Sequence, residues 1–259
     1  MDSLKTNYTD EQFEKLEQEE RTITDEAIAV MILLLSNAHS NLEKELRLFY
    51  QKYGKDGVVT YAEARKWVGA SDHRRRLTAL LALVSAELAS THNKLTPEFK
   101  SFLTKVIGKE SGFFDVEIDE EPVLQKDWGA DKSNWQERLA NDIALWTLYL
   151  GSDIKRLIHR QATIDAVLAQ VDKRFKSIKN ILEALALTES TAIGSIARNA
   201  IFDELGISKY QFYTKEDERR CETCGSMHGL IFPISAYEVG VTASPLHPRC
   251  RCWEVPIWD

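Results

Sequence analysis

Cysteine is missing from the first 220 residues of this chain, and its 259 residues include only 6 prolines and 12 glycines. So few turn-forming residues argue against disorder, and a hydrophobic content of 44% is enough to bury a sizeable core. Long apolar runs are missing as well, since the longest spans only residues 27–35. A bilayer crossing needs roughly 20 apolar residues. We therefore expect a folded, soluble protein without a membrane span.

Positive charge is also scarce, because acidic residues exceed basic ones and the formal net charge is −7. This balance argues against a generally basic nucleic-acid-binding surface, although it leaves room for local basic patches. The sequence further lacks a Gly-x-x-x-x-Gly-Lys phosphate loop, a Gly-x-Ser-x-Gly elbow, a His-Glu-x-x-His pair and a Gly-x-Gly-x-x-Gly turn after a strand. We therefore expect that the protein is not an enzyme.

Apolar residues recur three or four positions apart over most of the first 205 residues, which predicts a mainly α protein with an elongated multi-helix body. Thr9 is the expected cap of a long first helix. Further helices are expected to begin at Thr60 and at Pro97, which would occupy a first helical position. Gly151 is expected to break a later helix, and Gly206 stands where the last long helix should stop.

The pattern predicts four regions along the chain. Beyond residue 206, short aromatic or β-branched segments bounded by turn residues replace the helical period, so the tail is expected to be a small α+β domain. The predicted regions are an N-terminal helical region (1–110), an irregular crossover or hinge (111–133), a second helical region (134–206) and a metal-binding C-terminal domain (207–259).

All four cysteines lie in that tail, as Cys221-x-x-Cys224 followed by His247-Pro248-x-Cys250-x-Cys252. The first pair has the spacing of a tight turn that directs two sulfurs to one ion, with Gly225 supplying backbone freedom. The second half adds one imidazole and two thiols at a separation typical of small zinc modules. We therefore predict a zinc ion, and a structural one, because four protein ligands leave no open coordination position.

Five good ligands compete for four positions. Cys221 and Cys224 are the expected first pair and Cys250 the third ligand. The fourth is His247 or Cys252, and we prefer His247, because Cys250 and Cys252 share a face only if their segment is extended. His228 is expected to be a surface histidine.

Disulfides are the main alternative to a metal, since the cysteine count is even. They would need an oxidising compartment, and the first 25 residues show no basic, apolar and small-residue succession typical of an export signal. Acidic side chains near the cysteines, Asp217, Glu218 and Glu222, could act as a general base for a metal-bound water. A solvated acidic turn is the preferred interpretation.

Four arginines surround the candidate ligands, namely Arg219, Arg220, Arg249 and Arg251. They are candidates for contact with a phosphate or an acidic partner, although the acidic residues between 216 and 222 offset them locally.

These residues carry a resemblance to a known family. The segments are Tyr210-Gln-Phe-Tyr, Asp217-Glu-Arg219-Arg-Cys221-Glu-Thr-Cys224, Gly229-Leu-Ile-Phe232 and Pro245-Leu-His247-Pro248-Arg-Cys250-Arg251-Cys252. In order and spacing they resemble the C-terminal domain of the phage head morphogenesis, or Mu F-like minor head (minor capsid) protein, family. The chain departs from that pattern at Arg220, His228 and Leu187, where the family has threonine, aspartate and arginine.

The resemblance implies a minor capsid protein, present in few copies, that acts in head morphogenesis. Its implied partners are the portal protein and the scaffold or major capsid protein, with DNA as a further partner and no membrane. The implied location is the host cytoplasm during assembly and then the phage procapsid or virion head. Two other functions stay open: a DNA-binding ejection protein delivered with the genome, and a metal-dependent nuclease or effector domain.

Overall fold

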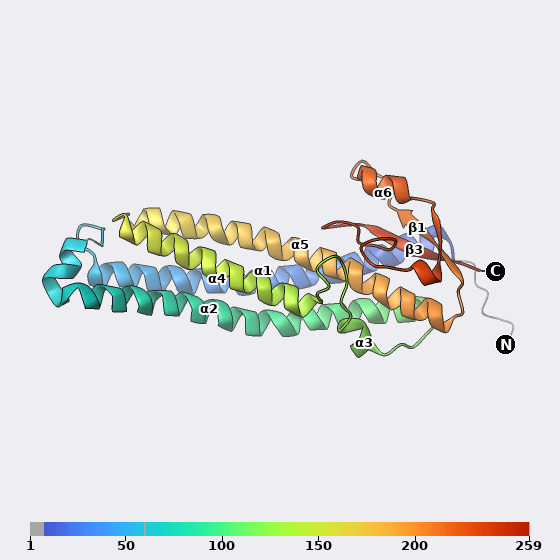
Figure 1. Ribbon diagram of the computed structural model, residues 1–259, viewed down its shortest axis with the longest axis horizontal. Helices are drawn as coiled ribbons and strands as arrows, with labels where there is room; N and C mark the ends of the chain where they lie inside the picture. Colours follow the sequence, from blue (N-terminus) through green and yellow to red (C-terminus); the bar gives the residue numbers. More distant parts are fainter. Residues whose placement is uncertain (1–7, 60, 259) are drawn as a thin grey trace. The chain divides into compact units, whose positions relative to one another are not determined.

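The computed structural model describes residues 8–59 and 61–258, with the side chains of 61–73 left aside. Within this part the chain forms six α-helices and a small three-stranded sheet, labelled in Figure 1. The helices are α1 (Asp10–Tyr53), α2 (Tyr61–Phe114), α3 (Glu120–Leu124), α4 (Trp135–His159), α5 (Ile164–Glu204) and α6 (Glu222–Met227). The strands are β1 (Lys209–Thr214), β2 (Ile231–Pro233) and β3 (Cys252–Ile257). The prediction of a mainly α protein with a small α+β tail is confirmed.

The chain folds into two compact units that each combine distant segments. The first unit takes the described parts of 1–28, 98–138 and 183–259, and the second takes 29–97 and 139–182. Three long helices, α1, α2 and α5, each contribute a stretch to both units. Because each compact unit combines distant segments, the two units do not test the four regions predicted along the sequence. Those regions stay predictions.

Local signals explain several helix boundaries. Thr9 caps α1 as expected, because its Oγ1 accepts the backbone N–H of Gln12 at 3.3 Å while the Gln12 side chain accepts the N–H of Thr9 at 2.8 Å. Asn134 caps α4 in the same way, with its Oδ1 accepting the N–H of Glu137 at 3.1 Å. Gly206, at φ +67°, ends α5 as predicted, and the N–H of Ile207 reaches back to the carbonyl of Phe202.

Two expected helix boundaries are wrong. Pro97 lies inside α2 and does not begin a helix, because buried residues continue at helical spacing on both sides of it, with Leu95 and Phe99 fully buried. Gly151 lies inside α4 between the buried Leu150 and Ile154, so it does not break that helix. The expected cap at Thr60 lies outside the described residues. Within the predicted hinge, α2 continues to Phe114 and α3 adds one further turn.

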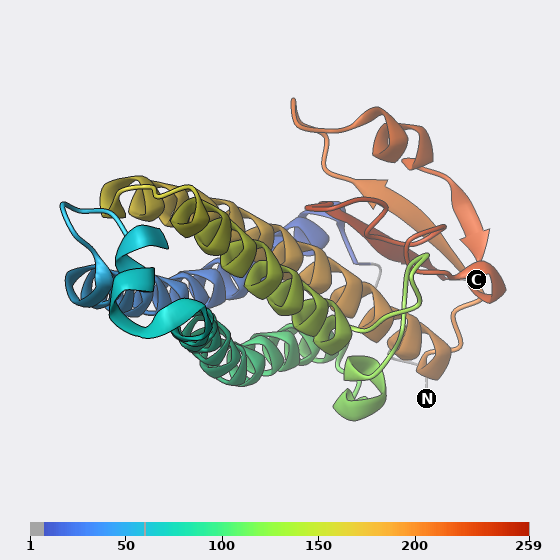
Figure 2. The same cartoon turned by 60° about the vertical axis from the view of Figure 1, so that its left-hand side comes forward.

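In the second unit, stretches of α1, α2, α4 and α5 run side by side (Figures 1 and 2). A buried carboxylate, Asp153, ties α4 to α5, because it accepts hydrogen bonds from Gln170 at 2.9 Å and from Arg174. Tyr50 in α1 donates its hydroxyl to the carbonyl of Ala162 at 3.0 Å. Among the helices described, none combines the length and apolarity that crossing a membrane would require.

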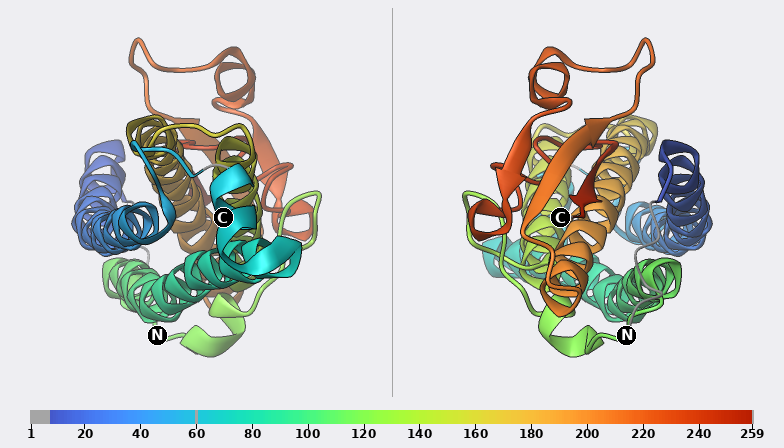
Figure 3. Two further views of the ribbon diagram at one scale, coloured as in Figure 1. Left: turned by 90° about the vertical axis from the view of Figure 1, so that its left-hand side faces the viewer. Right: turned by 90° about the vertical axis from the view of Figure 1, so that its right-hand side faces the viewer.

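The first unit contains the sheet, whose strand order is β2-β1-β3 with both pairings antiparallel. Figure 3 (right) shows this sheet beside the C-terminal part of α5. A cluster of buried aromatic and aliphatic residues joins the sheet to the segments of α1, α2 and α5 that belong to the unit. It consists of Phe13, Phe114, Ile201, Phe202, Ile207, Tyr210 and Trp253. The sheet therefore shares its core with α1, α2 and α5.

Candidate metal centre

The first cysteine pair lies on a short capped helix. Cys221 is the N-cap of α6, and its Sγ accepts the backbone N–H of Cys224 at 3.3 Å. One helical turn separates the two residues, so both sulfurs point to the same side. The N–H to sulfur bond also favours a thiolate: burial opposes it, yet the pKa of Cys221 is lowered by this bond and by His247.

Gly225 does not have the unusual backbone conformation that the sequence suggested. It has no positive φ and lies in the regular backbone of α6. A Cβ there would stand 3.4 Å from Nε of Arg220, which is an ordinary van der Waals contact. The prediction that Gly225 supplies unusual backbone freedom is therefore wrong.

His247 approaches this pair from a separate loop. Its Nε2 lies 3.1 Å from Sγ of Cys221 and 3.2 Å from Sγ of Cys224. The other ring nitrogen, Nδ1, lies 2.9 Å from the carbonyl oxygen of Pro248. A carbonyl can only accept, so Nδ1 carries a proton, and Nε2 is the ring atom directed at the two sulfurs. This orientation is the one that a metal-binding histidine needs.

The remaining two cysteines complete a second group around Cys224. Sγ of Cys224 lies 3.7 Å from Sγ of Cys250, and the ligand atoms of Cys224, Cys250 and Cys252 all lie within 4.8 Å of one another. Cys221, Cys224 and His247 form the other such group. Cys224 belongs to both groups, so the structure gathers all five candidate ligands around this one residue.

Burial and mutual contact also shape the charge of the thiols. Cys224, Cys250 and Cys252 are all buried. Hydrogen bonds from the other two thiols lower the pKa of Cys250, whereas contact with Cys250 raises the pKa of Cys224 and Cys252. The three buried thiols therefore compete with one another for ionisation. A divalent cation would remove this competition, because it stabilises several thiolates at once.

The donor set fits a soft divalent metal. Zinc binds thiolates at about 2.3 Å, which places two sulfurs of a tetrahedron about 3.8 Å apart. The 3.7 Å between Cys224 and Cys250 matches that edge. Every cysteine is a free thiol in this structure, and thiolate and imidazole are the ligands that zinc prefers. These side chains could hold a metal ion.

His228 lies apart from the candidate ligands. Its Nδ1 accepts the backbone N–H of Thr214 at 3.2 Å, and its ring packs against Tyr213 with centroids 4.6 Å apart. The opposite nitrogen, Nε2, faces Glu216 at 3.7 Å. Both ring nitrogens are thus directed to partners within the protein, and His228 belongs to neither of the two ligand groups.

Carboxylates accompany three of the four arginines singled out in the sequence. Arg251 makes a two-pronged ion pair with Asp217, at 2.5 and 2.7 Å. Arg220 contacts Glu216 at 3.1 Å, and Arg249 lies 4.0 Å from Glu183. Arg219 is exposed on the turn before α6.

The Arg251 pair also fixes the role of one acidic residue. The hydrogen bonds from Arg251 lower the pKa of Asp217 to about 2, although partial burial opposes the shift. A carboxylate with so low a pKa is a poor general base near neutral pH. The ion pair of Asp217 with Arg251 instead connects the start of β3 to the turn that precedes α6.

Helix α5 holds the ligand loop in place. Thr191 donates its hydroxyl to the carbonyl of Cys250 at 3.0 Å, and Thr188 accepts the backbone N–H of Arg249, also at 3.0 Å. Arg249 has a positive φ of 61°, a conformation uncommon for a residue with a side chain. The contact with Thr188 satisfies the N–H of this strained residue and aims the next one, Cys250, at the cluster.

A buried ion network lies two residues from the ligands along β3. Glu254 is fully buried and accepts from Nη1 of Arg198 at 3.0 Å, from Ser195 at 3.1 Å and from Tyr237 at 3.1 Å. Its other oxygen accepts the backbone N–H of Ser244 at 2.6 Å. Because Cys252 and Glu254 are two apart on one strand, they lie on the same face of the sheet.

The same arginine joins two further carboxylates. Glu110 of α2 accepts from Nε of Arg198 at 2.8 Å and also contacts Nη2, while Glu20 of α1 lies 3.8 Å from Nη2. Arg198 thus meets three buried carboxylates. One oxygen of Glu20 and one of Glu110 have no hydrogen-bond partner among the described residues.

Sequence reasoning missed this network. Arg198 stands within the apolar face of a helix and Glu254 between Trp253 and Val255, so each interrupts a hydrophobic pattern. That interruption was the available signal, because a charged residue is rarely buried unless it is paired. The identity of the partners had no such signal, since Glu110 and Arg198 are 88 positions apart.

Comparison with known proteins gives one match. The family model described as "Phage Mu protein F like protein" matches residues 150–255. No curated protein and no solved structure matches the chain. The matched region includes α5, β1, β2, α6, the first four residues of β3 and all five candidate ligands. The resemblance inferred from the sequence is thereby confirmed: residues 150–255 of this chain match the Phage Mu protein F-like family.

Proposed function

We propose that this chain is a phage minor head protein that acts in head morphogenesis and associates with the portal and the procapsid interior. The observation that carries the proposal is the family match over residues 150–255. Its role in the head is structural and not catalytic. The pairing of Arg251 with Asp217 and the low pKa of Asp217 support this, because they make Asp217 a poor general base near neutral pH.

We propose further that the cysteine cluster binds one structural zinc ion, with Cys221, Cys224, His247 and Cys250 as ligands and Cys252 as the alternate fourth. When bound, the ion would supply a crosslink between α6 and the 247–250 loop, and Cys252 as the alternate ligand would extend it to β3. The orientation of His247 by Pro248 supports His247 as a ligand, because it directs Nε2 at the sulfurs.

The carboxylate partners of Arg220, Arg249 and Arg251 weigh against a DNA-contact role for these arginines. A phosphate backbone would have to displace the ion pairs already present. The structural role in the head is therefore preferred over the ejection function.

The experiment is to assemble procapsids of the phage that encodes this chain, with and without its portal protein, and to measure the chain by quantitative mass spectrometry. We expect a few copies per particle, lost when the portal is absent. Equal amounts in both particles would argue against portal association, and absence from both would overturn the head assignment.

A further inference from the structure

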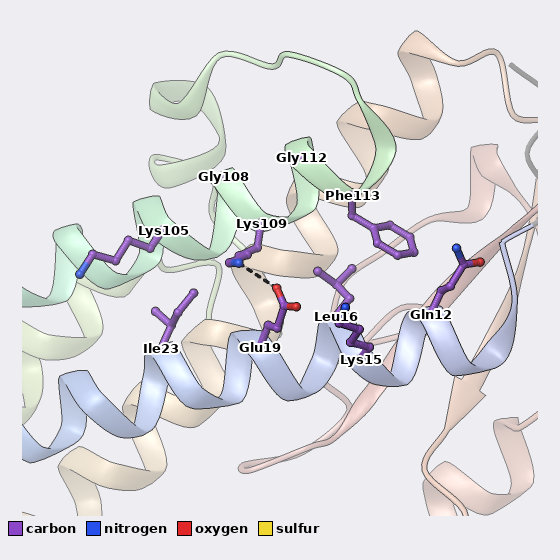
Figure 4. A pocket seen from close by; sticks show the side chains of 10 residues that line it. All are labelled: Gln12, Lys15, Leu16, Glu19, Ile23, Lys105, Gly108, Lys109, Gly112 and Phe113. Atoms are coloured by element: carbon purple, nitrogen blue, oxygen red, sulfur yellow. Dashed lines mark hydrogen bonds and ion pairs between the residues drawn. The ribbon is translucent and has the colours of Figure 1, made fainter.

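A long groove runs between α1 and α2 within the first unit. It encloses about 750 Å³ and lies between residues 12–23 of α1 and 105–113 of α2 (Figure 4). Leu16, Ile23 and Phe113 supply its apolar lining. The α2 side spans eight residue steps, or about 12 Å at 1.5 Å per residue. This length suits two to three turns of a docked helix.

Two glycines keep the groove open. Gly108 and Gly112 are one helical turn apart on the α2 side, and nothing lies within 4 Å of where a Cβ would stand at either position. Both are exposed. A docked chain could therefore approach the backbone of α2 closely, as small residues permit at helix–helix contacts.

The groove is basic on an acidic protein. Three lysines line it, Lys15, Lys105 and Lys109, against a single carboxylate, Glu19. Lys109 reaches across to Glu19 at 2.8 Å, an exposed pair that contributes little to stability (Figure 4). In the described part of the chain, Lys15 and Lys105 form no ion pair. The groove thus has a local charge of about +2, although the whole chain has a net charge of −7.

The apolar lining, the lysines along the edges and the exposed backbone of α2 together indicate what kind of molecule the groove would bind. We propose that this groove binds an amphipathic, acidic helix of a partner protein, with its apolar side chains on Leu16, Ile23 and Phe113. Acidic side chains along its edges would pair with Lys15 and Lys105, which lack ion-pair partners among the described residues. Nucleic acid fits less well, because phosphates gain nothing from an apolar floor and would meet Glu19. The binding rests on the chemistry of the groove and is independent of head association.

The test uses a labelled 12-residue helical peptide with leucine at positions 1, 4, 5 and 8, glutamate along both edges and alanine elsewhere. Fluorescence anisotropy with the full chain should give saturable binding that weakens as salt rises, because the edge contacts are ionic. A peptide with lysine in place of each glutamate should bind at least about tenfold more weakly, equivalent to about 1.4 kcal/mol.

Two groove variants locate the binding. Gly108→Leu fills the groove where no atom would clash, so it should fold normally and weaken binding about tenfold or more. Lys105→Glu should also weaken it, by reversing the charge at one end. The matched controls are Ser101→Leu, an exposed position of α2 outside the groove, and Lys126→Glu, an exposed lysine elsewhere in the same unit. Both controls should bind as the unmodified chain does.

Three outcomes would overturn the proposal. The peptide could fail to bind, or it could bind Gly108→Leu as well as it binds the unmodified chain. A duplex DNA of about 20 base pairs could instead bind the chain and lose that binding in Lys105→Glu. The last result would assign the lysines to nucleic acid, and the first two would leave the groove without this occupant.

Discussion

Arg198 carries one positive charge and meets three buried carboxylates. Glu110 and Glu254 already form ion pairs with Arg198, so these three groups together have a net charge of −1. An ionised Glu20 would raise this to −2 in a buried site. Burial first, and then the nearby Glu110, raise the pKa of Glu20 well above its ordinary value. The unpartnered oxygens of Glu20 and Glu110 agree with this, because a proton on Glu20 would turn one acceptor into a donor.

This arrangement predicts a pH-dependent stability that Glu20→Gln removes. A carboxyl group whose folded pKa is raised stabilises the protein fully below its unfolded pKa of about 4.3. That stability is lost as pH rises through the folded pKa. Glutamine mimics the protonated form and does not titrate. The free energy of unfolding of Glu20→Gln, relative to that of the unmodified chain, should therefore be about 1–3 kcal/mol higher at about pH 8 than at about pH 5. The measurement is thermal unfolding at both pH values.

Glu26→Gln is the matched control, since Glu26 is exposed on the same helix within the same unit. It should change the melting temperature equally at both pH values. If Glu20→Gln also gave no difference between them, Glu20 would be ionised in the folded protein, contrary to the expectation.

The competition between His247 and Cys252 for the fourth ligand position is a second question about single residues. With the proposed ligand set, Cys224→Ser should abolish zinc binding, because Cys224 is the residue common to both ligand groups. His247→Ala should lower affinity by at least tenfold, the effect expected from removing a ligand. Cys252→Ser should leave one zinc per chain.

Elemental analysis with a competing chelator measures stoichiometry and affinity together. Zinc lost in Cys252→Ser and retained in His247→Ala would assign the fourth position to the thiol. No metal in the unmodified protein, purified without chelators, would contradict the zinc proposal itself.

Two helical glycines have opposite roles at the scale of the helix. Gly108 faces open space, so Gly108→Ala should stabilise the protein by about 1 kcal/mol through helix propensity alone. A Cβ at Gly194 of α5 would stand 3.2 Å from Oε1 of Glu110 and 3.4 Å from Nη2 of Arg198. Because these atoms are fixed in the buried ion network, Gly194→Ala should destabilise the protein by about 1–2 kcal/mol.

Denaturant unfolding of both variants compares them directly. A stabilising Gly194→Ala would mean that the ion network can move aside, and that α5 does not need a glycine for close approach there.

Local sequence signals predicted those elements whose ends are fixed by nearby residues. Thr9 with Gln12, and Gly206 with its positive φ, act within one turn of the chain, so their boundaries follow from the sequence. Pro97 and Gly151 gave the wrong boundaries because buried residues on both sides carry the helices through them. Tertiary packing there outweighs the local preference of the residue.

The same distinction applies to the candidate site. The Cys221-x-x-Cys224 turn is local and was predictable, as was its relation to a second group of ligands. The contacts of Thr188 and Thr191 with the ligand loop join residues about sixty positions apart, and no local pattern marks them. Whether the gathered side chains bind a metal stays a prediction.

At the scale of the molecule, metal removal should have a limited effect. The sheet shares its core with α1, α2 and α5 through Tyr210 and Trp253, whereas the cysteines form a separate cluster with Phe212. Treatment with a zinc chelator should therefore make α6 and the 244–250 loop sensitive to protease while β1 and β3 stay protected. Limited proteolysis with mass spectrometry of the fragments measures this.

Phe13→Ala provides the contrast, because Phe13 is buried in the core that the sheet shares with the helices. This substitution should lower the free energy of unfolding by about 3–5 kcal/mol. It should also make the strands sensitive to protease even with metal present. Protease sensitivity of β1 after chelation alone would show instead that the metal supports the whole sheet.

The first unit is assembled from three stretches that are far apart in the chain, the last of which begins at residue 183. On the ribosome, the early part of α1 therefore emerges long before the strands that cover Phe13. The second unit, complete by residue 182, can form while synthesis continues, whereas the first must wait for the cysteine-bearing end. Phe13 and Phe114 would stay uncovered during that interval, so the rate of translation through the last eighty codons should govern how much nascent protein aggregates.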